Sequence, residues 1–445
     1  MKPSYIQITP NLGELLWKLP PSDELLALQL AYMDFLQTDW ADELHSLRLG
    51  FTRLSLQWKS SISQEKFNRL VPNHQMSPKP LSKKVWEIPV CYALELGEDL
   101  NELLDLVRSY TKAGYNQYAP MMGIPELRQK ISEKTLLTQA YSPNPDTEVT
   151  VVSGATEALF AAIAAVVSLG DEVILLDPAY DSYAPAVILN GGVPVYAALR
   201  DEDYAVDWDE ILSKVSPATR AIVVNTPHNP SGYVWTKEDV KQLADLVDRT
   251  GIYVISDEVY EHITFDDRNH ICLGSHPGLR SHTFVCGSFG KTFHVTGWKI
   301  GYCIAPVSLM VEFRKIHQYL TFSTVSPMQY ALASYLEDKE KYLSLPNFYQ
   351  KKRDDFVEGL EKTPFKFQSA AGSFFQWVSY AHLSDMSDFE LATRMTKELK
   401  VACIPFSVFY SDQRDLKRLR FCFAKEKQEL DLAVERLCRI HEILV

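Results

Sequence analysis

The chain has 445 residues, a length that fits roughly two to four domains of ordinary size. Hydrophobic residues make up 46% of it and charged residues 23%. This is the balance of a folded globular protein and excludes a mainly disordered chain. The 45 basic and 57 acidic residues give a net charge of −12. We therefore expect no nucleic acid partner and no attachment to anionic membranes.

The sequence predicts neither membrane insertion nor secretion. Its longest purely apolar run, Ala158–Val167, has ten residues, whereas a membrane-spanning helix needs about 20. The first residues lack the apolar stretch of a signal peptide. The seven cysteines are scattered and form no CxxC motif, which indicates reduced thiols in a cytoplasmic protein.

Residues 1–85 predict a small α+β domain with the element order ββαββα. Apolar alternation and helical spacing place its elements at Tyr5–Thr9, Leu12–Leu19, Asp23–Leu36, Leu44–Leu49, Phe51–Trp58 and Gln64–Leu70. Three prolines, at positions 72, 78 and 80, then mark a polar linker. We assign residues 86–110 to the junction with the rest of the chain.

Residues 111–345 predict a large α/β domain. Short β-branched runs alternate with helical segments, which favours a mostly parallel sheet flanked by helices. The expected strands are Val149–Val152, Val173–Leu176, Val193–Tyr196, Ala221–Asn225, Ile252–Ser256, Thr283–Gly287 and Lys299–Ile304. Residues 346–445 predict a smaller α/β domain with a long helix, strands at Phe374–Val378 and Leu419–Phe423, and a C-terminal helix.

Polar clusters follow several of these strands, where the carboxyl ends of an open α/β sheet bind ligands. After Val152 come Gly154, Ala155 and Thr156, small residues that open a helix. The backbone N–H groups at such a helix start can bind an anion. An ordinary capped helix would have the same pattern.

Two further clusters carry an amide and a carboxylate. Asn229 lies in a turn between Pro227 and Pro230, which can hold its amide in a fixed direction. Asp257 follows the next strand, and a carboxylate there needs a cationic or donor partner. Tyr260 can face the same cleft if its segment turns helical. A structural turn, a capping acid and a core tyrosine are the simpler alternatives.

The last cluster contains Ser288 and Lys291, with a second lysine, Lys299, close behind. Partial burial or a neighbouring cation lowers the pKa of a lysine and makes it a nucleophile toward carbonyls. A solvated lysine is the alternative. Together the clusters fit a phosphate-bearing aldehyde cofactor held by Lys291 as a Schiff base, with Asp257 on a ring nitrogen and Tyr180 stacked on the ring. Asn229 and Tyr260 would bond the ring hydroxyl.

From about residue 110 to the end, the chain resembles a class I, fold-type I pyridoxal-phosphate aminotransferase of the methionine and aromatic branch, near the kynurenine aminotransferases. The resemblance rests on these clusters and on the segments 115–123, 177–183 and 419–425. It implies pyridoxal 5'-phosphate as cofactor, amino-acid and 2-oxo-acid substrates, and Lys291 as the proton shuttle. It further implies Lys299 on the cofactor phosphate, Arg420 on the substrate carboxylate, and Tyr118 reaching the phosphate of the other protomer in a homodimer.

Residues 1 to about 103 resemble the start of KipI-type proteins, the family that includes the KipI-like component of 5-oxoprolinase. The similarity rests on the ββαββα order, the Leu49-Gly50-Phe51 hairpin and the run Trp86–Tyr92. It implies a KipA-like partner, the companion component of 5-oxoprolinase. The aminotransferase family usually opens with a substrate-lining arm that is absent here. Leu96–Asp99 lies at a similar distance before Tyr118, and the helix Leu100–Tyr110 could replace the helix after that arm.

Three functions remain open at this stage. The leading one is transfer of an amino group from a methionine, aromatic or glutamine-type amino acid to a 2-oxo acid. We expect Tyr118, Tyr180 and Tyr183 to line its substrate site, with Phe322 as a further candidate. A β-lyase acting on cysteine conjugates would use the same lysine and aspartate. A non-catalytic fusion that binds a partner through its N-terminal domain is the third. The sequence has no HExxH motif and no phosphate-binding nucleotide motif, so we expect neither a metal nor a nucleotide.

Overall fold

The computed structural model of the protein describes residues 97–444. The α+β domain predicted for residues 1–85 and the start of the junction lie outside the described residues. All described residues belong to one compact unit. None of their helices is long and apolar enough to cross a membrane.

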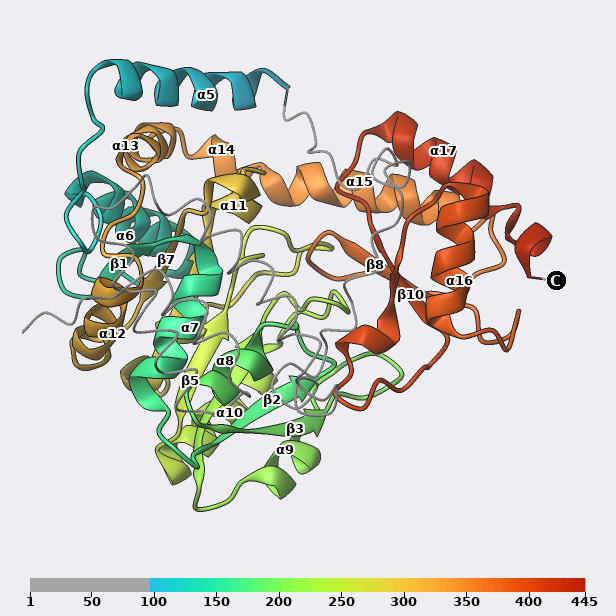
Figure 1. The fold of residues 1–445 in the computed structure, drawn as a ribbon, viewed down its shortest axis with the longest axis horizontal. Helices are drawn as coiled ribbons and strands as arrows, with labels where there is room; N and C mark the ends of the chain where they lie inside the picture. The colour runs from blue at the N-terminus through green and yellow to red at the C-terminus, as the bar shows by residue number, and fades with distance from the viewer. Residues whose placement is uncertain (1–96, 445) are drawn as a thin grey trace, which may run out of the picture. The chain divides into compact units, whose positions relative to one another are not determined.

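A seven-stranded sheet forms the centre of the large α/β region (Figure 1). Its strand order is β1-β7-β6-β5-β4-β2-β3, and β7 alone runs opposite to the other six strands. The strands are β1 Val149–Val152, β2 Glu172–Asp177, β3 Val193–Ala198, β4 Thr219–Asn225, β5 Tyr253–Asp257, β6 Thr283–Ser288 and β7 Gly301–Ile304. The predicted fold class is therefore confirmed.

Helices cover both faces of this sheet because successive strand residues enter different cores. On β2, Val173 packs with α7 (Gly154–Val166) and α12 (Val307–Leu320), whereas Ile174 packs with α10 (Lys237–Thr250) on the opposite face. Burial on both faces explains why these strands read as continuous apolar runs. The helices around the sheet are α7 Gly154–Val166, α8 Tyr183–Leu189, α9 Trp208–Lys214, α10 Lys237–Thr250 and α12 Val307–Leu320.

A three-stranded antiparallel sheet, in the order β8-β10-β9, lies in the C-terminal part of the chain (Figure 1). Its strands are β8 Phe375–Ser379, β9 Ile404–Pro405 and β10 Arg418–Cys422. The helices that pack with it in the largest core include α15 Leu345–Leu360, α16 Asp388–Arg394 and α17 Lys427–Leu437. The domain boundary at residues 345 and 346 stays a prediction.

The remaining helices are α5 Gly97–Lys112, α6 Pro125–Gln139, α11 Phe289–Thr292, α13 Ser326–Tyr335 and α14 Glu340–Leu343. Helix α5 packs along α13 and contains the helix predicted for Leu100–Tyr110. One local expectation was wrong. The last strand of the large sheet begins at Gly301 rather than Lys299, because a short turn over Thr296–Trp298 leaves Lys299 in the left-handed region with φ 54°. Tyr260, whose segment was considered as a helix, lies in a turn.

Candidate active site

One cavity of about 390 Å³ lies where strands β4, β5 and β6 end. This volume is within the usual range for a small-molecule or cofactor site. Eleven of the twelve predicted site residues line it: Gly154, Ala155, Thr156, Tyr180, Asn229, Asp257, Tyr260, Ser288, Lys291, Lys299 and Arg420. The clusters therefore meet in one place, as the strand-end argument predicted.

The start of α7 and Lys299 form a cationic cradle on one side of the cavity. Gly154 has φ +76°, and a Cβ there would come 3.0 Å from the Lys299 Nζ atom. A Cβ on Gly301 would lie 2.9 Å from the Ala155 backbone nitrogen. The two glycines thus let the helix start, the lysine and β7 approach one another. Free N–H groups beside an ammonium group suit a phosphate.

Asp257 ends β5 with its side chain buried in the cavity wall. The Tyr183 hydroxyl donates to its Oδ2 atom at 2.6 Å, and the Val259 backbone N–H donates to Oδ1 at 3.3 Å. Burial raises the pKa of Asp257 to about 6, although the Tyr183 hydrogen bond and nearby Lys291 lower it. Asn225, its register partner on β4, donates its amide to the Asp257 carbonyl at 2.9 Å.

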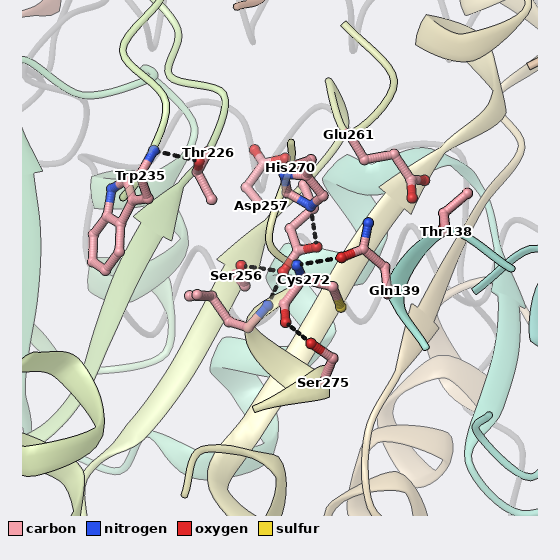
Figure 2. A network of polar contacts seen from close by, with 12 residues as sticks. Thr138, Gln139, Thr226, Trp235, Ser256, Asp257, Glu261, His270, Cys272 and Ser275 are labelled. Carbon is pink, nitrogen blue, oxygen red and sulfur yellow. Dashed lines mark hydrogen bonds and ion pairs between the residues drawn. The ribbon is translucent and has the colours of Figure 1, made fainter. Parts of the chain in front are cut away.

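The next acid, Glu258, belongs to a separate buried network that includes Ser256 and His270, both labelled in Figure 2. Its carboxylate accepts hydrogen bonds from the Ser256 hydroxyl at 2.8 Å and the Leu273 N–H at 2.9 Å, and it contacts the His270 Nε2 atom at 2.7 Å. Cys272 joins the same network through its N–H, which donates to Gln139 at 2.9 Å. Glu258 does not line the cavity. Its partners are internal, which fits a structural role.

Lys291 sits on α11, directly after β6. Burial is the largest effect on its amine and lowers the pKa of Lys291. The Nζ atom lies 5.7 Å from the centroid of the Tyr260 ring and 5.6 Å from that of the Phe374 ring. The preceding strand, β6, packs closely against Tyr302. The Tyr302 ring occupies the space that a Cβ atom on Gly287 of β6 would need. The packing around β6 thus sets where this amine lies.

Arg420 reaches the cavity from β10. Its guanidinium group donates to the Asn229 side-chain oxygen. It also lies between two rings, 3.8 Å from the Phe375 centroid and 4.6 Å from the Phe409 centroid. Cation–π contacts of this kind hold a guanidinium group in one orientation.

Tyr180 lines the cavity, and its ring meets the Tyr183 ring at 5.7 Å in a T-shaped contact. Tyr118 is the predicted site residue that does not line it. Its side chain is 83% exposed and packs edge-on against Phe322 at 5.5 Å. Phe322 also lies outside the cavity. An exposed tyrosine is what a contact with a second protomer would require.

Sequence reasoning missed several residues of the cavity. Tyr183 lines the cavity as expected, but its hydrogen bond to Asp257 and the bond from Asn225 depend on strand order, which spacing alone does not give. The small sheet and its loops supply four apolar side chains, Phe375, Ile404, Val408 and Phe409, and the loop after β2 supplies Asp181. Leu100, which ends the segment compared with the usual arm, does not line the cavity.

The residues present fit pyridoxal phosphate. The cradle suits its phosphate, Asp257 its ring nitrogen and the buried Lys291 amine its aldehyde. Fold and site together define a fold-type I pyridoxal-phosphate enzyme. A family model described as aminotransferase class I and II matches residues 97–437, and the chain belongs to this family.

Individual relatives agree with the family assignment. The chain is 46% identical to the methionine aminotransferase of Escherichia coli, over 75% of this chain and 87% of that protein. It is 36% identical to human kynurenine–oxoglutarate transaminase 3, over 72% and 77% of the two chains. The aromatic aminotransferase structure from Pyrococcus horikoshii superimposes with a TM-score of 0.73 at 31% identity, covering 78% of this chain and 93% of that one. The protein is a pyridoxal-phosphate-dependent aminotransferase.

Proposed function

We propose that this aminotransferase takes the amino group from methionine, an aromatic amino acid or glutamine, with Lys291 as its catalytic residue. The observation that carries this proposal is the placement of Lys291. Its buried amine shares a cavity of about 390 Å³ with the phosphate cradle, Asp257 and Arg420. For an amino acid joined to the cofactor, Arg420 would bind the carboxylate, Asp257 the ring nitrogen and the cradle the phosphate.

The cofactor would be held at three points. Gly154, Ala155, Thr156, Ser288 and Lys299 would bind its phosphate, and Asn229 and Tyr260 its ring hydroxyl. Asp257 would pair with the ring nitrogen while Tyr180 covers the ring face. When bound, pyridoxal phosphate supplies an electron sink for the bond that breaks at the substrate α-carbon.

Lys291 would hold the cofactor and then move the α-proton. The lowered pKa of its amine supports this role, because an uncharged amine can accept a proton. Burial also keeps water away from the reacting carbon. Among the cavity-lining residues of the described chain, the other amine is that of Lys299, which belongs to the cradle.

The cavity favours an apolar substrate side chain. Phe375, Ile404, Val408 and Phe409 line it near Arg420. Its basic lining residues are Lys291, Lys299 and Arg420, all assigned to other tasks, while Asp181 adds negative charge. A substrate with a second carboxylate would have no further cation to bind in this cavity. The methionine aminotransferase similarity agrees with this preference.

A panel of amino donors with a keto-acid acceptor tests the proposal. We expect methionine, phenylalanine, tyrosine or glutamine to give the highest kcat/KM, and aspartate one of the lowest. Borohydride treatment followed by peptide mass mapping should place the cofactor on Lys291. Aspartate as the best donor, or pyruvate release from a cysteine conjugate without any keto acid, would contradict the donor assignment. A label on another lysine would contradict the role of Lys291.

Replacing Asp257 by asparagine should lower kcat by about 10²–10³-fold, because a fixed charge opposite the ring nitrogen is lost. The native enzyme should lose activity as the pH falls through the pKa of Asp257. That pKa is about 6 without cofactor, and a cation on the ring lowers it further. The acid limb should thus lie at or below about pH 6 and disappear in Asp257→Asn. A pH–rate profile of both proteins checks this, and an unchanged rate would leave Asp257 a structural role only.

We also propose a homodimer in which Tyr118 contacts the cofactor phosphate of the other protomer. Its exposure and its position outside the cavity of its own chain support this.

The six cysteines of the described residues are free thiols, which supports the cytoplasm as location. The KipA-like partner, the companion component of 5-oxoprolinase, stays a prediction for the N-terminal residues, where the family model has no match. Co-purification of such a partner with the full chain tests it.

A further inference from the structure

We propose that Tyr183 is a positioning residue, which keeps Asp257 oriented and ionised and steadies the ring of Tyr180. The inference rests on the role of Asp257 proposed above. The structure places the Tyr183 hydroxyl 2.6 Å from the Asp257 Oδ2 atom, with both side chains buried. The second carboxylate oxygen has only a long contact, 3.3 Å, to a backbone N–H. Tyr183 is thus the principal side-chain donor to this carboxylate among the described residues.

The direction of this hydrogen bond follows from the surroundings. Burial, reinforced by the nearby Asp257 carboxylate, raises the pKa of Tyr183 well above its usual range. The tyrosine therefore keeps its proton and donates, and the carboxylate accepts. A donor to the charged form lowers the pKa of a carboxyl group, and Tyr183 has this effect on Asp257.

Other groups around Asp257 do not replace this donor. Lys291 lies close enough to lower the pKa of Asp257, but its amine would be engaged with the cofactor and the substrate proton. Glu258 adds negative charge, which opposes ionisation of Asp257. Among the described residues, Tyr180, Tyr260 and Cys286 also face Asp257, and burial raises the pKa of each, so they stay uncharged at neutral pH.

The second contact of Tyr183 links it to the cofactor face. Its ring meets the Tyr180 ring edge-on at 5.7 Å. Tyr183 is also the first residue of α8, which packs against α7. One side chain therefore touches both the carboxylate for the ring nitrogen and the ring that would cover the cofactor. Its position is fixed by the fold and not by the ligand.

The test uses the cofactor-loaded full chain with Tyr183→Phe, which removes the hydroxyl and keeps the ring. Tyr349→Phe is the matched control, because the Tyr349 hydroxyl is buried without a hydrogen-bond partner among the described residues. We expect Tyr183→Phe to lower kcat about tenfold on the acid limb of the pH–rate profile and about twofold at pH 7, with little change in KM. The acid limb of the pH–rate profile should move up by about one pH unit, the size expected for a hydrogen bond to a charged group. The control should match the native enzyme in both.

Two further readouts separate positioning from simple stability. The midpoint of the pH titration of the cofactor's visible absorbance should shift in Tyr183→Phe and not in Tyr349→Phe. Because Tyr183 acts through Asp257, the double variant Tyr183→Phe/Asp257→Asn should be no slower than Asp257→Asn alone. Additive losses, or equal behaviour of Tyr183→Phe and the control, would overturn the inference. An unaltered rate in Asp257→Asn would instead overturn the proposed role of Asp257.

Discussion

Replacing Lys291 by alanine should abolish turnover while the protein keeps its fold. No other cavity-lining amine of the described residues is placed to hold the cofactor aldehyde and move the α-proton. Loss of one acid–base group costs about 10²–10⁴-fold in rate, and here the covalent attachment is lost as well. We expect less than about a hundredth of the native rate in a coupled assay of product keto acid.

Folding of this variant can be followed separately. The amine is buried with a lowered pKa, so its removal takes away little favourable charge and the melting temperature should stay close to the native value. Lys315→Ala, at an exposed position on α12, is the control and should keep full activity. A Lys291→Ala variant that retains more than about a hundredth of the rate would show that the attachment site lies elsewhere.

Replacing Arg420 by alanine should raise KM by about 10²–10³-fold. A guanidinium group binds a carboxylate through two parallel hydrogen bonds, and truncating one partner of a buried charged pair costs about 2–5 kcal/mol. At about 1.4 kcal/mol per tenfold change, this loss spans roughly 30- to 4,000-fold, and the expected value lies in the middle of that span. Steady-state kinetics with methionine measure it.

Two neighbouring variants sharpen this prediction. Arg418→Ala changes an arginine on the same strand that hydrogen-bonds to Tyr204 and does not line the cavity, so KM should stay within a few-fold of native. Arg420→Lys keeps the charge but not the planar fork, and its KM should lie between those of the native enzyme and Arg420→Ala. Equal KM values for Arg420→Ala and Arg418→Ala would remove Arg420 from the substrate site.

The strand-end residues were predictable because parallel strands bring their carboxyl ends together. Gly154, Asp257 and Lys291 each follow a β-branched run, so their common location needed only the α/β rhythm. Arg420 was found through family resemblance, since its strand belongs to the other sheet and spacing cannot relate the two sheets.

Sequence spacing could not predict contacts between segments that become neighbours only through the order of the strands in the sheet. Tyr183 meets Asp257 because α8 follows β2, which lies next to β4, and β4 pairs with β5. The apolar wall from Phe375 and Phe409 likewise depends on how the small sheet packs. Lys299 was predicted to lie in a strand because it precedes an apolar run. Its left-handed backbone conformation delays the start of that strand to Gly301.

The two adjacent acids at the end of β5 have a consequence for insertions and deletions. Asp257 faces the cavity, and Glu258 faces the buried network of Ser256 and His270. Side chains on a strand alternate between the two faces, so a shift by one residue exchanges them. Deleting a single residue upstream in β5 would bring the longer Glu258 side chain to the cofactor position and leave His270 without its carboxylate. A point substitution cannot restore the original register of the strand. We therefore expect selection to remove insertions and deletions in β5 more strongly than substitutions within it.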